Sequence, residues 1–162
     1  MLIHLMQHGA CLPKEVNPNQ PLSPVGREQV EKSARSAAIL GLRFQLVVAS
    51  PKLRSFQTAE IMAEQTGYPP SHIVVTDAVK AMAQTSETLR FINEYVGLDS
   101  IFIAGHLPSL ALLASAILSP AKGVDIRVEN GGLMQIALEP GQAAGTLNWT
   151  MTPTQLAVLA GS

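Results

Sequence analysis

The chain has 162 residues, of which 47% are hydrophobic and 14% are charged, and its formal net charge at pH 7 is −1. This length predicts one domain, spanning residues 1–162, with a substantial buried core, and the composition excludes a disordered chain. No cluster of lysine and arginine predicts a nucleic-acid or membrane surface, and no apolar stretch is long enough to span a bilayer.

Cys11 is the only cysteine, which excludes an internal disulfide and a thiolate zinc site. No clustered carboxylate or thiolate completes a zinc site around His4 and His8 either. The first residues lack the charged start and the long apolar core of a signal peptide. The sequence therefore predicts a cytoplasmic protein.

The first predicted element is a strand that starts at Leu2 and runs into His8 and Gly9. Its continuous apolar run is typical of a strand that is covered on both faces of a parallel sheet. Gly9 allows a sharp turn or the close approach of a ligand. His8 is therefore expected at the carboxyl end of a strand, where open α/β sheets bind ligands. His4 is expected to be a hydrogen-bonded residue of the core.

Residues 10–21 contain three prolines and predict a loop that forms a wall over this strand end. Ser23 and Pro24 then predict the N-cap and the first residue of a helix that continues to about Leu40 and stops at Gly41. The residues expected on the buried side of this helix are Val30, Ala34, Ala37, Ala38 and Ile39.

A second strand is predicted over residues 45–49 and is followed by Ser50. Ser50 is expected to cap a helix whose first turn carries Lys52 and Arg54 and which continues to Gly67. A third strand is predicted over residues 71–76, with His72 at its surface, and a helix over residues 86–95.

Residues 101–104 predict a fourth strand that leads to His106, followed by a buried helix over residues 107–118 with Pro108 in its first turn. Two turns, at residues 130–132 and 141–145, introduce strands over residues 133–138 and 146–151, near one edge of the sheet. Strands that alternate with helices predict an α/β fold, with a mostly parallel sheet covered on both faces.

Three side chains of types that take part in catalysis and anion binding are expected at one edge of this sheet, because His8, Arg54 and His106 each follow the end of a strand. Arg54 opens a helix, where unpaired N–H groups and the helix dipole favour an anion, and its guanidinium suits phosphate oxygens. The pattern predicts a phosphate site with one imidazole as a nucleophile and the other as a donor.

Five segments, in this order, carry a resemblance to a known family. They are Met6-Gln7-His8-Gly9, Pro21-Leu22-Ser23-Pro24-Val25-Gly26, the stretch 50–59 that begins Ser50-Pro51-Lys52-Leu53-Arg54, Gly105-His106-Leu107-Pro108, and Asn148-Trp149-Thr150-Met151-Thr152-Pro153. With these segments the chain resembles the histidine phosphatase superfamily, and within it the small SixA-type phosphohistidine phosphatases.

This resemblance implies a three-layer α/β/α sandwich of the phosphoglycerate-mutase-like kind and a phosphatase without metal or organic cofactor. It implies that His8 attacks phosphorus and forms a transient phosphohistidine, which water hydrolyses. Arg54 and His106 would hold the phosphoryl oxygens, and Gln7 and Gly9 would also border the phosphate. The implied substrate is a phosphohistidine on a protein, or a small phosphorylated molecule.

The chain departs from the family at Gln7, where the family motif has the arginine of Arg-His-Gly. A charge-assisted hydrogen bond contributes about 1.5–3 kcal/mol, and loss of one transition-state donor commonly costs about 10²–10³ in rate. Slow turnover is therefore expected, with Lys14 as a candidate substitute cation. The competing interpretation is a module that has lost turnover and binds a phosphorylated partner.

The sequence does not identify a general acid. Larger family members supply a carboxylate after the third strand, and here Asp77 and Glu87 lie nearby in the sequence but in no recognisable motif. SixA-type members make little use of such an acid, which suits a phosphoramidate because its nitrogen leaves easily. A mutase or a sugar-phosphate phosphatase would need a clear acid and a substrate-enclosing insertion.

Overall fold

The structure, a computed structural model, describes residues 1–161 and contains a six-stranded sheet of order β3-β2-β4-β1-β5-β6. The strands are β1 (Leu2–Gln7), β2 (Leu46–Ala49), β3 (Val74–Val75), β4 (Ser100–Gly105), β5 (Leu133–Ala137) and β6 (Thr146–Met151). The first four pair in parallel, and β5 runs antiparallel to both of its neighbours. The predicted, mostly parallel sheet is confirmed.

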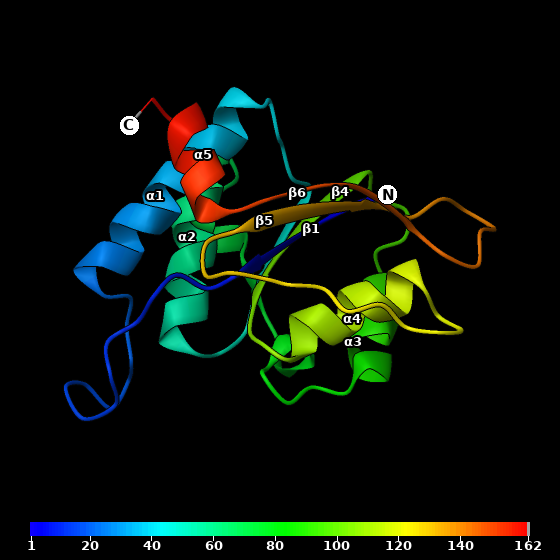
Figure 1. Ribbon diagram of the computed structural model, residues 1–162, viewed down its shortest axis with the longest axis horizontal. Helices are drawn as coiled ribbons and strands as arrows, with labels where there is room; N and C mark the ends of the chain where they lie inside the picture. The colour runs from blue at the N-terminus through cyan, green and yellow to red at the C-terminus, as the bar shows by residue number, and fades with distance from the viewer. Residues whose placement is uncertain (162) are drawn as a thin grey trace.

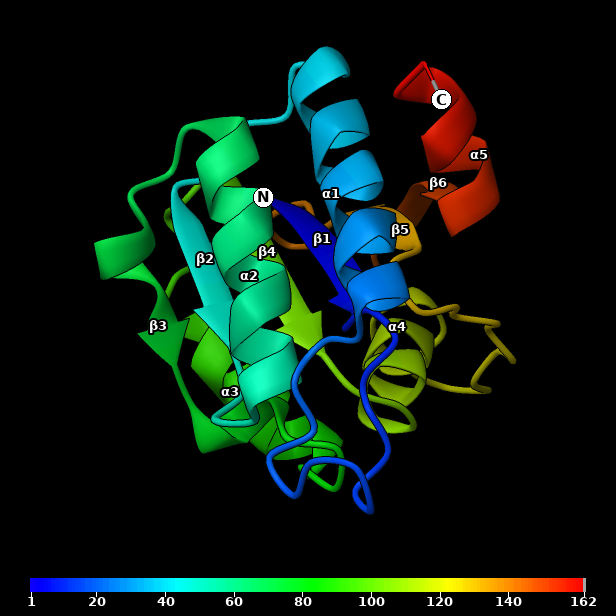
Figure 2. The same cartoon turned by 90° about the vertical axis from the view of Figure 1, so that its left-hand side faces the viewer.

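Helices cover both faces of this sheet, as the two cartoon views show (Figures 1 and 2). One face carries α1 (Pro24–Ile39), α2 (Leu53–Thr66) and α5 (Pro153–Leu159), and the other carries α3 (Thr85–Asn93) and α4 (Ser109–Leu118). The predicted α/β/α sandwich is therefore confirmed. No helix within residues 1–161 is both long and apolar enough to cross a membrane.

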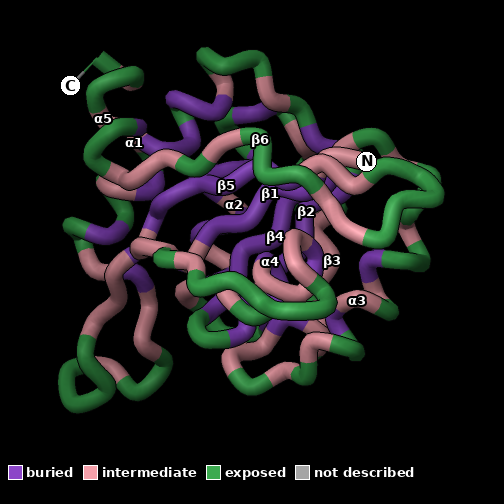
Figure 3. The backbone as a smooth tube through the Cα atoms, turned by 45° about the vertical axis from the view of Figure 1, so that its right-hand side comes forward, coloured by how far each residue is buried: buried purple, intermediate pink, exposed green. Residues whose placement is uncertain are grey.

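The core lies in two layers because successive strand residues face opposite sides of the sheet. On β2, Val47 and Ala49 pack with the α1 and α2 side, whereas Leu46 and Val48 pack with the α3 and α4 side. All four side chains are buried, and the tube drawing shows the central strands as the most buried part of the chain (Figure 3). The strands near the site are thus held from both sides.

The first helix forms as the sequence predicts, with one error. The hydroxyl of Ser23 accepts a hydrogen bond from the Gly26 amide at 3.0 Å, and Gly41 follows the helix with a φ of 74°. Ile39, which was expected to be buried, is 60% exposed. Ile39 does not lie on the buried stripe formed by Val30, Ala34 and Ala37. Ser33 and Ser36 are buried instead. Their hydroxyl groups donate hydrogen bonds to the carbonyls of Gly131 and Leu156, respectively.

Three other elements differ from the predictions. The third strand is restricted to Val74–Val75, since residues 70–72 form a 3₁₀ turn and β3 is an edge strand that pairs only with β2. Pro108 precedes α4 instead of lying in its first turn. The sequence analysis missed α5, although Thr152 and Gln155 form a capping box at its start.

His4 is a core residue, as predicted, with only 1% of its surface exposed. Its Nδ1 lies 3.1 Å from the Ile101 carbonyl oxygen, and its Nε2 lies 2.9 Å from the side-chain nitrogen of Gln135. Burial lowers the pKa of His4 to about 4, with the hydrogen bond to Ile101 acting in the opposite direction. The buried imidazole therefore stays neutral in the native protein at neutral pH.

This pKa predicts a loss of stability in acid. Below its ordinary pKa of 6.5, His4 takes up a proton in the unfolded chain, but in the folded chain it does so only near pH 4. The free energy of unfolding should therefore fall as the pH falls through this window, by about 2 kcal/mol at pH 5 for this one group. Urea unfolding at pH 8 and pH 5 measures the difference. It should shrink in His4→Gln and persist in His72→Gln, and an unchanged difference in His4→Gln would contradict the assignment.

Candidate active site

The register of the parallel strands brings the two strand-end histidines together. Gln7, the last residue of β1, pairs with Gly105, the last residue of β4, and the His8 amide donates to the Gly105 carbonyl at 3.0 Å. The next residues along the two strands, His8 and His106, therefore follow side by side. Their ring centroids lie 4.9 Å apart with an angle of 62° between the planes.

The hydrogen bonds of His8 fix which of its nitrogens carries the proton. Nδ1 lies 2.7 Å from the carbonyl oxygen of Gly9, which can only accept. Nε2 lies 3.2 Å from Nε of Arg54, and a guanidinium N–H can only donate. The two partners together require Nδ1–H and leave the lone pair on Nε2. The nitrogen available to react is thus the unprotonated Nε2, which lies beside the positive charge of Arg54.

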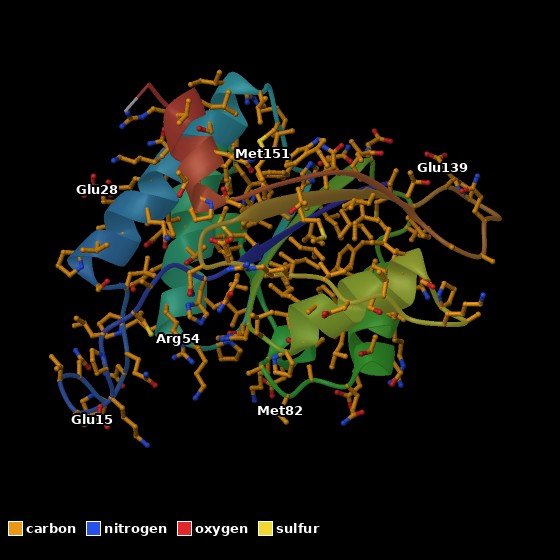
Figure 4. All side chains as sticks on the ribbon, in the orientation of Figure 1. Glu15, Glu28, Arg54, Met82, Glu139 and Met151 are labelled. Atoms are coloured by element: carbon orange, nitrogen blue, oxygen red, sulfur yellow. The ribbon has the colours of Figure 1, made fainter. Side chains whose placement is uncertain are left out.

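Arg54 reaches His8 because α2 is fastened to the ends of the strands. Near the start of the helix, the hydroxyl of Ser55 donates to the Ala104 carbonyl at 2.8 Å and accepts from the Ser50 amide at 3.0 Å. The Thr58 hydroxyl donates to the Arg54 carbonyl and accepts from the Gly9 amide at 3.1 Å. Figure 4 labels Arg54 in the first turn of α2, beside the loop that follows β1.

Gly9 is required at its position by close packing. A Cβ atom there would lie 2.5 Å from a methyl carbon of Val30 and 2.8 Å from the Gly26 carbonyl oxygen. Gly26 is tighter still, since a Cβ atom there would approach the Ala10 carbonyl oxygen to 1.8 Å. The start of α1 therefore packs directly on the turn after β1 and holds the carbonyl group that orients His8.

The second histidine has a partner that the sequence analysis assigned otherwise. Ser50 was expected to cap α2, but the helix begins at Leu53 with Lys52 as its N-cap residue. The fully buried Ser50 hydroxyl lies 2.6 Å from Nε2 of His106 and also accepts from the Lys52 amide at 3.3 Å. Its position at the end of β2, on the same sheet edge as both histidines, is the sequence signal that could have indicated this contact.

The Ser50 contact also orients the proton of His106. The Ser50 hydroxyl is fully buried, and within residues 1–161 Nε2 of His106 is the only acceptor in contact with it, so its proton is assigned to that nitrogen. The imidazole proton then lies on Nδ1, which has no hydrogen-bond partner among residues 1–161. The site thus combines an acceptor nitrogen on His8 with a donor nitrogen on His106, beside one guanidinium.

Both imidazoles are neutral at neutral pH. Burial lowers the pKa of His8, the Gly9 hydrogen bond opposes this, and the charge of Arg54 lowers the pKa further. Burial is also the largest influence on His106 and, with the charges of Arg54, Lys52 and a protonated His8, lowers its pKa to about 3. Lys52 thus influences the site. It does so from the N-cap position of α2, where its backbone is extended.

Within residues 1–161, no hydrogen bond joins the cluster of His8, Arg54 and His106 to the other side chains predicted for the site. The side chain of Gln7 is half-buried and lines a surface cavity of about 400 Å³. Lys14 is exposed in the loop after β1 and makes no hydrogen bond or ion pair with any residue of 1–161, so its role stays a prediction. Asp77 pairs with Lys80 at 2.8 Å and, with Glu87, lines a different cavity from that of Gln7.

No group of three or more histidine, cysteine or carboxylate side chains that could hold a metal is found within 1–161.

The chain matches the family model of the histidine phosphatase superfamily (branch 1) over residues 3–84, which is more than half of its length. The chain belongs to the histidine phosphatase superfamily. As a member of this family, the chain is a phosphatase. The matched region contains His8, Ser50 and Arg54. An uncharacterized protein of Picosynechococcus sp. is 26% identical over 148 residues, covering 88% of this chain and 87% of that protein.

Solved structures of two phosphatases share the fold. The protein histidine phosphatase SixA, solved in complex with tungstate, superposes with a TM-score of 0.87 at 21% identity, covering 96% of this chain and 99% of that one. The alpha-ribazole phosphatase from Shigella flexneri superposes with a TM-score of 0.71 at 17% identity, covering 94% and 97% of the two chains. The predicted phosphoglycerate-mutase-like fold is confirmed.

The contact between Ser50 and His106 predicts an effect on the histidine proton. Ser50→Ala should move the His106 proton to a mixture of Nδ1 and Nε2 and should lower kcat/KM about tenfold, with the fold retained. Two-dimensional ¹⁵N NMR of the histidine side chains reads the protonated nitrogen directly. Ser23→Ala, which removes a helix cap and costs about 1 kcal/mol of stability, is the control and should leave His106 unchanged. An unaltered His106 spectrum in Ser50→Ala would refute the positioning role.

Proposed function

We propose that this histidine phosphatase hydrolyses phosphohistidine on a protein through a phosphohistidine intermediate on His8. The observation that supports this most strongly is the orientation of His8, whose unprotonated Nε2 is directed at Arg54. A phosphoryl group bound by the guanidinium would lie against that lone pair. His106 would donate from Nδ1 to a second phosphoryl oxygen, and Gly9 would hold the nucleophile in its tautomer.

The reaction has two displacement steps. In the first, the Nε2 lone pair of His8 forms a bond to phosphorus while the bond from phosphorus to the substrate nitrogen breaks, and that nitrogen takes a proton from water. In the second, water attacks phosphorus while the bond to Nε2 breaks, the attacking water gives up a proton to the hydroxide left by the first step, and inorganic phosphate leaves. Arg54 and His106 would stabilise the charge that develops on the phosphoryl oxygens in both steps.

The surroundings of the cluster support a leaving group that needs no strong acid. The carboxylates considered from the sequence, Asp77 and Glu87, line a cavity with Arg90 and Glu94 that contains neither Gln7 nor His8. An alkoxide leaving group requires protonation, whereas the nitrogen of a phosphoramidate leaves more readily. The arrangement therefore favours phosphohistidine over an ordinary phosphate ester.

A second candidate function is favoured by Gln7. Gln7 directly precedes His8 in the chain and carries no charge, so the phosphoryl group would meet fewer fixed charges than Arg54 and an arginine at position 7 together would supply. Such a site can retain a phosphorylated partner while turning over slowly or not at all. The chain would then act as a module that binds a phosphorylated protein.

Hydrolysis assays with three proteins separate the two functions. The wild type should release phosphate from phosphohistidine faster than from a chromogenic aryl phosphate, and His8→Ala should abolish release from both. Gln7→Arg should raise kcat/KM about tenfold or more, since it adds a charged donor beside the phosphoryl group.

His72→Ala, a change at an exposed histidine far along the chain, is the matched control and should retain full activity. Absence of turnover in the wild type, with tungstate binding intact, would favour the binding module. Turnover that survives in His8→Ala would rule out the proposed nucleophile.

A further inference from the structure

A cavity beside Gln7 brings chain neighbours of the two histidines together with a segment that the sequence analysis did not assign to the site. Gln7 precedes His8 and Leu107 follows His106, and both residues line this cavity of about 400 Å³. Its other wall comes from residues 127–130, which lie between α4 and β5. In Figure 1 this segment returns along the sheet from the far end of α4 to the start of β5. The cavity thus borders the candidate site on the Gln7 side.

The segment is fastened to the end of β1 near this cavity. The side-chain amide of Asn130 donates to the His8 carbonyl at 2.6 Å, and the Gly131 amide donates to the Gln7 carbonyl at 2.9 Å. The Gly131 carbonyl accepts from the buried hydroxyl of Ser33 at 2.7 Å. Since the backbone is fixed at residues 130 and 131, the position of residue 127 relative to His8 is restricted.

Arg127 is the one cation among the residues that line this cavity. Its side chain is 90% exposed, and its only ion pair with any residue of 1–161 is a long one, with 3.8 Å between its Nε and a carboxylate oxygen of Glu129. An exposed pair of this length contributes little, so a more highly charged anion can replace Glu129 at small cost. Arg127 is therefore an exposed guanidinium whose present partner binds it weakly.

The known cations of the site lie on another side. Arg54 and Lys52 belong to the start of α2, and their charges act on His106 from there. On the Gln7 side the cavity offers only uncharged amides, from Gln7, Gln29 and Asn130, apart from Arg127 and its partner. A phosphoryl dianion between two neutral imidazoles would thus be neutralised from one side only, unless Arg127 contributes.

We infer that Arg127 is a phosphoryl-binding residue, which leaves Glu129 and turns into the cavity beside Gln7 when a tetrahedral oxyanion binds between His8 and His106. This inference rests on the proposed phosphate site but not on turnover. Arg127 supplies, from the segment between α4 and β5, the positive charge that Gln7 does not provide. A guanidinium placed at position 7 would enter the same cavity and replace it.

Calorimetric titration with tungstate tests this without any reaction. Arg127→Ala should weaken tungstate binding at least about tenfold, and Glu129→Gln should strengthen it a few-fold because the competing carboxylate is removed. Gln7→Arg should restore tungstate affinity in the Arg127→Ala background. Arg43→Ala, an arginine near the opposite ends of the strands, is the matched control and should bind as the wild type does.

The same variants in the phosphohistidine assay separate this inference from the proposed function. Tungstate binding that depends on Arg127, in a protein without phosphohistidine turnover, would support the inference and refute the proposed function. Unchanged tungstate affinity in Arg127→Ala would overturn the inference even if the enzyme is active. A loss of tungstate affinity in Arg127→Ala that Gln7→Arg fails to restore would also overturn the inference, because the two guanidinium groups would then not occupy the same position.

Discussion

The proposed chemistry of this protein depends on the two hydrogen bonds that hold the His8 imidazole. A carbonyl oxygen on one side and a guanidinium N–H on the other leave the ring only one tautomer, with its lone pair directed toward a positive charge. Burial and the nearby charge of Arg54 keep the ring unprotonated, because both lower its pKa. The proposed nucleophile is thus held by two partners, of which Gly9 serves only to orient it and Arg54 would also bind the phosphoryl group.

That pair of hydrogen bonds is a consequence of sheet register and helix anchoring. The parallel pairing of β1 with β4 places His8 beside His106, and the hydroxyl of Ser55 ties α2 to β4 so that Arg54 meets His8. Gly26 and Gly9 permit α1 to pack against the turn after β1 without a gap for a side chain. A one-residue slip of β1 would exchange the faces of His8 and Gln7 and remove the imidazole from the cluster.

The sequence was most informative where a local rule and the global fold agree. The continuous apolar runs predicted β1, β2 and β4, and Ser23, Gly41 and Gly67 marked helix ends that the structure confirms. It was least informative where contacts with residues distant in the sequence determine the local structure. The exposure of Ile39, the short β3 and the placement of Ser50 against His106 follow from packing and edge pairing, which no local pattern contains. Arg127 shows the same limit, because only the cavity relates it to Gln7.

The regiochemistry of a trapped phosphoenzyme tests the central claim most directly. The protein is incubated with the small donor phosphoramidate and quenched in alkali, and the phosphorylated residue and ring nitrogen are identified by fragmentation mass spectrometry and ³¹P NMR. The account predicts a single phosphoryl group, on Nε2 of His8. A phosphoryl group on Nδ1, or on any other residue, would contradict it.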